Sequence, residues 1–365
     1  MNINKEQVIE ILKSVIHPEK GKDIITLDYV KELQVYDGHI NFKLEFERVN
    51  DPLKNSLKRA CEQLIKDRIS PDINVDIQLI TKLNLSNKKE ESPTSKIKNI
   101  VAISSGKGGV GKSTLATNLA VAFGKTGAKV GLIDADIYGP SIPKMMGVED
   151  VRPMVEKIND KDMLIPVDAH GIKVLSIGFF VNANDATVWR GPMASNAFQQ
   201  LINDANWGEL DYLFIDLPPG TSDIHLTLVQ SVSVNGAVIV STPQNVAIAD
   251  VVKGISMFKN PNINVPILGV VENMAWFTPD ELPDNKYYIF GKEGCKKVCE
   301  ELNVPLLGQI PIVQSICEDS DAGQPSVLQK NTVSEAFKTL AENIRLELIK
   351  RNANLEPTKK VEMTR

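Results

Sequence analysis

The fold is decided by one stretch, Gly106-Lys107-Gly108-Gly109-Val110-Gly111-Lys112-Ser113-Thr114. It has the spacing G-x-x-x-x-G-K-[ST], in which glycines let consecutive backbone N–H groups turn inward around an anion. An apolar run precedes it, and residues 115–120 have a helical pattern, so the positive end of a helix dipole would face the same anion. We therefore predict a nucleotide-binding loop in which Lys112 contacts the β- and γ-phosphates and Ser113 ligates magnesium.

Around this loop, short apolar runs alternate with helical stretches from Asn99 to about Ile349. The candidate strands are Ile100-Val101-Ala102-Ile103, Val130-Gly131-Leu132-Ile133, Val174-Leu175-Ser176-Ile177, Tyr212-Leu213-Phe214-Ile215, Ala237-Val238-Ile239-Val240 and Ile267-Leu268-Gly269-Val270-Val271. Continuous apolar strands are typical of a mostly parallel sheet with helices on both faces. The predicted class is α/β, and ligands of such sheets bind beyond the carboxyl ends of the strands.

Acidic residues follow two of these strands. Asp216 ends the run 212–215 and is predicted to hold magnesium or its water. Asp134 and Asp136 follow the run 130–133, and an i, i+2 spacing on an extended chain puts two side chains on one face. We expect one of them near magnesium and the other near the attacking water. Capping of a helix is the alternative role for either aspartate.

Lys107 stands early in the loop, where the basic loop pattern requires no charge. One interpretation is a solvated lysine. The other is a cation that reaches phosphate charge in its own subunit or in a facing one.

The chain is predicted to hold two domains. Residues 1–81 show helix, strands, helix and strand, enough for a small α+β domain. Residues 82–98 are rich in charge, Ser and Pro and are predicted to be a flexible linker. Residues 99–350 form the phosphate-loop domain, and its last helix is followed by a polar tail over 351–365.

Composition excludes several classes of protein. Of 365 residues, 42% are hydrophobic and 24% are charged, which supports a real core and rules out a wholly disordered chain. The net charge of −5, without a basic block, argues against nucleic-acid binding. No apolar run reaches the ~18–20 residues of a membrane span, and no signal peptide is visible. Four scattered cysteines do not make a disulfide framework, so we expect a cytoplasmic protein.

Several motifs resemble one family. The loop from Lys107 to Ser113 resembles the deviant phosphate loop of the MinD/ParA/nitrogenase-iron-protein class of dimeric ATPases. Within that class, four further segments are similar to the Mrp/ApbC subgroup: Asp134-Ala-Asp136-Ile-Tyr-Gly-Pro-Ser-Ile-Pro143, Trp189-Arg190-Gly191-Pro192-Met193, Asp216-Leu-Pro-Pro-Gly220-Thr-Ser-Asp223 and Val271-Glu272-Asn273-Met274. The N-terminal domain resembles the small domain of iron–sulfur assembly factors through His17-Pro18-Glu19 and Asp23-Ile24-Ile25-Thr26-Leu27.

The resemblance implies a slow ATPase that carries iron–sulfur clusters to apoproteins or works with assembly factors. It implies a homodimer with the nucleotides facing the interface, in which Lys107 crosses to the other subunit's phosphates. It also implies that Asp136 orients the water, Asp216 serves magnesium and Asn273 contacts adenine. ATP, magnesium and an iron–sulfur cluster are thus the expected ligands, with no nucleic acid and no membrane among the partners.

One departure from the family concerns the cluster. Members usually carry Cys-x-x-Cys shortly after the segment that matches 272–274, whereas residues 275–283 of this chain hold no cysteine. A cubane cluster needs about four sulfurs, which two such pairs across a dimer would supply. Cys295 and Cys299 share a face of a predicted helix, and Cys295 is the better candidate ligand; an ordinary buried pair is the alternative.

Two other functions stay open from the sequence. A MinD/ParA-like switch would use ATP to drive dimerisation and partner binding without a cluster. It should show a basic membrane helix or a basic DNA patch, and neither is evident. A small-molecule kinase is also compatible with the loop alone, but it needs an acceptor pocket that the sequence does not locate.

Overall fold

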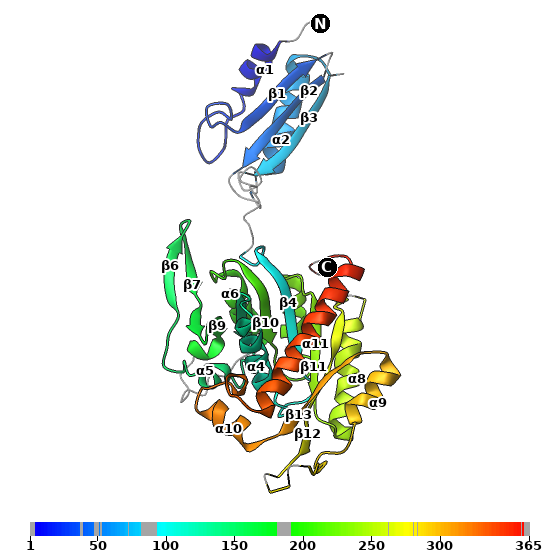
Figure 1. Cartoon of the computed structure of the whole chain (residues 1–365). Coiled ribbons are helices and arrows are strands. Elements are labelled where there is room, and N and C mark those ends of the chain that lie inside the picture. Colours follow the sequence, from blue (N-terminus) through cyan, green and yellow to red (C-terminus); the bar gives the residue numbers. More distant parts are fainter. Residues whose placement is uncertain are drawn as a thin grey trace. The chain divides into compact units, whose positions relative to one another are not determined.

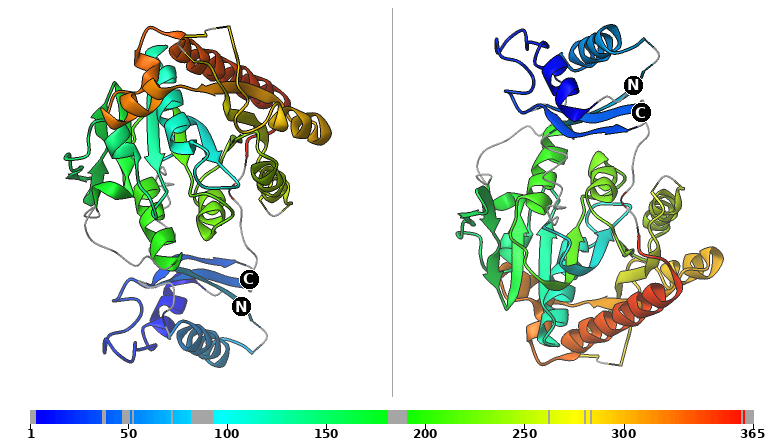
Figure 2. Two further views of the ribbon diagram at one scale, coloured as in Figure 1. Left: turned by 90° about the horizontal axis from the view of Figure 1, so that it is seen from below. Right: turned by 90° about the horizontal axis from the view of Figure 1, so that it is seen from above.

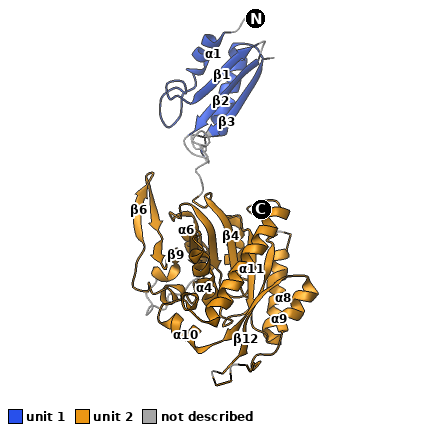
Figure 3. Ribbon diagram, viewed as in Figure 1, with its two compact units in different colours: residues 1–90 blue, residues 91–365 orange. Residues whose placement is uncertain are grey.

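The chain, seen here in a computed structural model, divides into two compact units, residues 1–90 and 91–365 (Figure 3). The residues that the structure describes are 4–36, 39–46, 51, 53–71, 73–81, 93–180, 191–261, 263–279, 281–282, 284–358 and 360. Across these ranges, every helix is too short or too polar to cross a membrane.

The smaller unit is a sheet covered by two helices over its described residues (Figure 1). Its elements are α1 (Lys5–Leu12), β1 (Val30–Tyr36), β2 (His39–Phe46), α2 (Lys54–Arg68) and β3 (Asn74–Thr81). Strand β1 pairs with β2 antiparallel, and β2 pairs with β3 in parallel. Helix α1 ends at Leu12, although apolar residues recur at helical spacing as far as Ile16.

The larger unit is built on an eight-stranded sheet within the described residues, in the order β13-β12-β11-β4-β10-β5-β9-β8. All neighbouring pairs are parallel except β8 with β9. The strands of this sheet are β4 (Ile97–Ser104), β5 (Val130–Asp134), β8 (Val167–Ala169), β9 (Ile172–Ser176), β10 (Leu210–Asp216), β11 (Gly236–Ser241), β12 (Ile267–Phe277) and β13 (Leu306–Ile312). Strands β6 (Met154–Ile158) and β7 (Lys161–Ile165) form a separate antiparallel hairpin.

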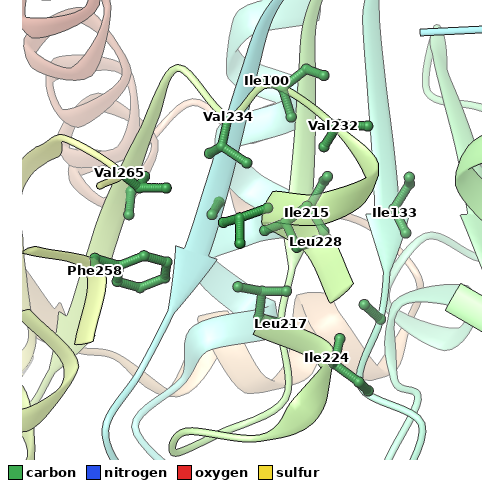
Figure 4. Packing of buried hydrophobic residues seen from close by; sticks show 14 of the residues in the cluster. Ile100, Ile133, Ile215, Leu217, Ile224, Leu228, Val232, Val234, Phe258 and Val265 are labelled. Atoms are coloured by element: carbon green, nitrogen blue, oxygen red, sulfur yellow. The ribbon is translucent and has the colours of Figure 1, made fainter. Parts of the chain in front are cut away.

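Helices cover both faces of this sheet (Figure 2). The helical segments are α4 (Lys112–Lys125), α5 (Ile142–Met145), η1 (Ile177–Phe179), α6 (Gly191–Asn203), α7 (Asp223–Ser231), α8 (Asn245–Lys259), α9 (Gly294–Leu302), α10 (Gln314–Asp321), η2 (Ser326–Leu328) and α11 (Thr332–Asn354). Residues of α6 to α9 pack in one apolar cluster, part of which Figure 4 shows, and residues of α4, α5 and α11 pack in the other. Along β4, Ile100 and Ala102 belong to the first cluster and Val101 and Ile103 to the second, as the alternation of a strand requires.

The predicted α/β class and all six predicted strands are confirmed. The hairpin β6–β7 and strand β8 were not predicted, because their short runs mix charged and apolar residues. Strand β13 was not predicted either, because Gly308, Gln309 and Pro311 interrupt its apolar run. Two boundaries differ from the sequence analysis. Strand β4 already begins at Ile97, inside the predicted linker, because Ile97 packs in the core. Helix α11 continues to Asn354, past the predicted start of the tail at 351, because Arg351 is itself buried.

Candidate functional site: a phosphate loop beside buried carboxylates

The phosphate loop joins β4 to α4 through closely packed glycines. Gly109 and Gly111 both have a φ of +79°, a conformation that residues with side chains rarely adopt. Gly106 lies against α8, where an added Cβ would come within 2.4 Å of the backbone carbonyl of Asp250. Gly111 caps α4, so the unpaired N–H groups of the first turn of this helix lie at the loop. The loop is thus shaped to place main-chain donors around an anion.

Lys112 brings a buried cation to this helix end. Its Nζ lies 2.8 Å from Oδ1 of Asp216 and 3.7 Å from Oδ2 of Asp136, and Ser113 Oγ lies at 3.5 Å. Only 6% of the Lys112 side chain is exposed, so the carboxylates hold its charge inside the site. A phosphate entering the loop would compete with these carboxylates for the ammonium group.

Asp216 stands at the centre of the site because β10 lies between β4 and β5. Its carboxylate is fully buried and accepts a 2.6 Å hydrogen bond from the Ser113 hydroxyl. Burial raises the pKa of Asp216, and the neighbouring Lys112 ammonium opposes that shift. Magnesium prefers oxygen ligands and is held by one or two protein groups together with substrate phosphates and waters. The adjoining oxygens of Ser113 and Asp216 fit that requirement.

Asp134 was predicted as a magnesium ligand, but its carboxylate oxygens accept hydrogen bonds from protein groups. Its Oδ1 accepts from the backbone N–H of Asp136 at 3.2 Å, and its Oδ2 accepts from the Ser176 hydroxyl at 3.0 Å and the Ile142 N–H at 3.2 Å. Burial and the Asp216 carboxylate raise the pKa of Asp134 well above its usual range. Both of its oxygens are therefore engaged in holding the loop that follows β5.

Asp136 and Lys107 occupy the more open side of the site. The Asp136 side chain is 14% exposed and faces the Lys112 ammonium, so the structure brings it to the loop. Lys107 is exposed, and its carbonyl accepts a 3.0 Å hydrogen bond from Ser105 Oγ, which fixes the backbone of the loop and leaves the side chain at the surface. Thr114, the last residue of the predicted motif, accepts from the Asn118 amide through its carbonyl at 2.9 Å.

Asn273 is anchored on the loop itself. Its Nδ2 donates to the Val110 carbonyl at 2.9 Å, across 163 residues of sequence. The preceding residue, Glu272, is fully buried and accepts hydrogen bonds from the Cys295 N–H at 2.7 Å and the Gln309 amide at 2.6 Å. Strand β12 therefore holds a fixed side-chain amide against the phosphate loop.

The contact of Asn273 with the phosphate loop predicts that two glycine substitutions in the loop will destabilise the protein to different extents. Gly111→Ala would place a Cβ 2.2 Å from Asn273 Nδ2, whereas Gly109→Ala meets nothing within 4 Å at the same φ. We expect Gly111→Ala to lower the free energy of unfolding by about 1–3 kcal/mol more than Gly109→Ala, as overpacking does. Urea unfolding of the nucleotide-free variants measures this difference. Adding Asn273→Ala should recover most of it, and equal costs for the two single variants would refute the contact.

The cysteines are dispersed through the structure. Cys61 is buried in the smaller unit, Cys295 and Cys299 are buried on α9, and Cys317 is exposed on α10. Burial raises the pKa of Cys295 above its usual range and that of Cys299 to about 11, so both thiols keep their protons. Cys295 Sγ lies 3.8 Å from the Thr242 carbonyl. Nowhere in the described chain do three or more His, Cys, Asp or Glu side chains gather as they would around a metal ion.

Some residues of the sequence analysis lie outside the described chain. These are Trp189 and Arg190 of one family motif and residues 82–92 of the predicted linker.

Sequence reasoning missed two polar groups near the loop. His225 is buried, with only 1% exposed, and it both caps α7 and lies 3.3 Å from Ser104 Oγ. The spacing Ser222-x-x-His225 is a capping-box pattern that could have located the cap. Ser176, which holds Asp134, carried no signal in the sequence.

Two family models match the chain. The model of NUBPL iron-transfer P-loop NTPases matches residues 96–345, and that of iron–sulfur cluster assembly proteins matches residues 5–77. Among curated relatives, the iron–sulfur cluster carrier protein of Synechocystis is 41% identical over 94% of this chain and 97% of its own length. The carrier protein of that name from Haemophilus influenzae is 42% identical over 94% of this chain and 92% of its own.

Solved structures show the same fold. A nucleotide-binding protein of Archaeoglobus fulgidus in complex with ADP superposes with a TM-score of 0.56 at 38% identity and covers 65% of this chain and 91% of its own. The cell division ATPase MinD of Pyrococcus furiosus superposes with a TM-score of 0.50 at 26% identity, over 68% of this chain and 98% of its own.

Proposed function

The chain belongs to the NUBPL family of iron-transfer P-loop NTPases, and from this we propose that it is a dimeric ATPase that binds iron–sulfur clusters and delivers them to apoproteins. The observation that carries the nucleotide chemistry is the cluster of Lys112, Ser113 and Asp216 at the N-terminus of α4. Identity of 41–42% to carrier proteins over 94% of the chain favours this function over a MinD-like switch, since the MinD structure is 26% identical.

Binding begins at the phosphate loop. The backbone N–H groups around Gly109 and Gly111 and the first turn of α4 would surround the β- and γ-phosphates. The Lys112 ammonium would leave Asp216 Oδ1 for phosphate oxygens, a short movement because the buried side chain already lies at the helix end. Asn273, fixed to the Val110 carbonyl, would meet the adenine.

Hydrolysis requires a positioned water and charge neutralisation. Ser113 and Asp216 would hold magnesium, which supplies positive charge to the β- and γ-phosphate oxygens. The Asp136 carboxylate would accept a hydrogen bond from the attacking water, whose oxygen forms the new bond to the γ-phosphorus as the bond to ADP breaks. Asp134 supports this step by holding the Asp136 backbone, and its carboxyl group lies beside Asp216 at the proposed magnesium site. Because water activation rests on this one carboxylate, we propose that turnover is slow.

A second copy of the chain would complete the site. Lys107 is exposed at the loop, so its ammonium is available to phosphates bound in a facing subunit. Closure of two copies over two nucleotides would exclude water from the phosphates, which strengthens each charge interaction there. We propose that the dimer forms in the cytoplasm and that apoproteins and assembly factors are its partners.

The cluster is the cargo of the proposed function, and the described thiols do not form a site for it within one subunit. Cys295 is the candidate ligand from the sequence. To become a ligand, its thiol would have to lose its proton and leave the apolar core against which α9 packs. Cys299 lies one turn further along the same helix and is buried as well.

Anaerobic reconstitution with iron and sulfide tests the cargo. We expect the wild-type chain to take up both, with the absorbance of a cluster. Cys295→Ala should take up the same amount, because a buried thiol that keeps its proton is a poor ligand. Cys299→Ala is the matched control on the same helix, and iron and sulfide per chain are counted for each protein.

Two outcomes would change this account. No iron uptake by the wild-type chain would contradict the carrier function. Loss of iron in Cys295→Ala, with uptake retained by Cys299→Ala, would instead assign Cys295 as a ligand.

A further inference from the structure

A buried histidine next to the phosphate loop has no part in the proposed chemistry. His225 is the third residue of α7, between Ile224 and Leu228, which pack in the core with Phe258 (Figure 4). Its ring centroid lies 6.1 Å from that of Phe258, and only 1% of the residue is exposed. Burial lowers the pKa of His225 to about 4, so the ring is neutral at physiological pH. A buried polar ring of this kind is retained only with hydrogen-bond partners on its nitrogens.

The two ring nitrogens have different partners. The backbone N–H of Ser222 points to Nδ1 at 3.2 Å, and because an N–H can only donate, Nδ1 is the acceptor. In the neutral ring the proton is then on Nε2. Nε2 lies 3.3 Å from Ser104 Oγ, so the ring donates to that hydroxyl. This assignment follows from the hydrogen-bond network.

The second hydrogen bond joins two functional segments. Ser104 is the last residue of β4, directly before the phosphate loop. His225 follows the loop 217–222, which starts immediately after Asp216. Backbone bonds also tie this loop to the same strand end, from Leu217 N–H to Ile103 O at 3.0 Å and from Gly220 N–H to Ser105 O at 2.8 Å. His225 adds a side-chain link at the far end of the loop, across 121 residues of sequence.

We propose that His225 is a positioning residue: its Nε2–H holds Ser104, and this link keeps the loop 217–222, and with it Asp216, in register with the phosphate loop during ATP hydrolysis. The inference rests on the proposed ATPase function, and it adds a residue to which the mechanism above assigns no role. In this role the ring would contact neither the nucleotide nor magnesium. It acts through the geometry of the groups that do, and misplacement of such groups by ~1 Å can cost up to ~100-fold in rate.

Two substitutions separate the link from the helix cap. Asparagine places its Oδ1 as many bonds from Cβ as Nδ1 of histidine, so His225→Asn keeps an acceptor for the Ser222 N–H and loses the donor to Ser104. Glutamine places its Nε2 as many bonds from Cβ as Nε2 of histidine, so His225→Gln keeps the donor. Ser104→Ala removes the link from the other side. Thr227→Val is the control on α7, because the Thr227 hydroxyl donates only to the Asp223 carbonyl of its own helix.

We expect His225→Asn and Ser104→Ala to lower kcat by about 10-fold with the affinity for MgADP changed less than about twofold. The kcat values of His225→Gln and Thr227→Val should stay close to that of the wild-type protein. The double variant Ser104→Ala/His225→Asn should be no worse than either single variant, because both remove the same bond. Equal kcat values for His225→Asn and His225→Gln would overturn the proposal, since the ring would then serve only as a cap or as filling.

Hydrogen exchange gives a readout that does not depend on activity. In the nucleotide-free chain, the Gly220 amide should exchange faster in His225→Asn and Ser104→Ala than in wild type and Thr227→Val, because the loop that carries it is less restrained. A wild-type chain without ATP hydrolysis would refute the proposed function, and the exchange rates would still decide on the link. Unchanged exchange of Gly220 in both link variants would overturn the proposal even if hydrolysis is slowed.

Discussion

Lys112→Ala is expected to abolish nucleotide binding. The substitution removes the one buried cation at the N-terminus of α4, where only 6% of the Lys112 side chain is exposed. Truncating one partner of a buried, hydrogen-bonded charge pair costs about 2–5 kcal/mol, which corresponds to a weakening of binding by roughly 30- to 5000-fold. The loss of affinity should be near the upper end of this range, because the Lys112 charge also opposes the rise in the pKa values of Asp216 and Asp134 that burial causes. Without Lys112, the phosphates would meet the carboxyl groups of Asp216 and Asp134 with no positive side chain between them.

Equilibrium dialysis with radiolabelled ATP and magnesium measures the effect. Lys125→Ala is the matched control, since it removes the same charge from the exposed end of the same helix. Circular dichroism establishes that the Lys112→Ala chain is folded before its binding is compared. Normal ATP affinity in a folded Lys112→Ala protein would count against the assignment of residues 106–114 as the phosphate loop.

Asp136→Ala should separate binding from hydrolysis. Asp136 lies 3.7 Å from the Lys112 ammonium and is partly open to solvent, the place where an attacking water would be oriented. Removing a positioned acid–base group costs about 100- to 10,000-fold in the chemical step. ATP affinity should change little, because Lys112 keeps its stronger contact at 2.8 Å with Asp216 until phosphate arrives.

Phosphate release under single-turnover conditions reports the chemical step. Asp150→Ala, an exposed carboxylate further along the same connection, is the control for loss of charge. Turnover at the wild-type rate in Asp136→Ala would remove this residue from the water-positioning role and leave the loop assignment untouched.

The fold could be predicted from the sequence because the central strands are continuous apolar runs. Strands that are buried on both faces, such as β4, β10 and β11, consist mostly of apolar residues, so the sequence alone identifies them as strands. The hairpin β6–β7 has little buried surface, so its mixture of charged and apolar residues gives no period to detect. The extension of α11 past residue 351 depends on the burial of Arg351, a residue type that is usually exposed.

The site was predictable where a spacing fixes the geometry. The glycines and Lys112 lie within one short segment, residues 106–112, so the loop motif locates them, and Asp216 is located by its place at the end of a strand. The partners of these groups come from distant segments. Ser176 reaches Asp134 across 42 residues and His225 reaches Ser104 across 121, and such contacts depend on strand order, which sequence period does not encode. The close approach of Asn273 to Gly111 belongs to the same class of contact.

The most direct measurement is a calorimetric titration of the pure, wild-type chain with ADP and with ATP in the presence of magnesium. A glycine-lined helix end with Lys112 and the Ser113–Asp216 pair should give saturable heat with both nucleotides. A flat titration with both, from protein shown to be folded, would contradict the central claim that this chain works by binding a nucleotide at residues 106–114.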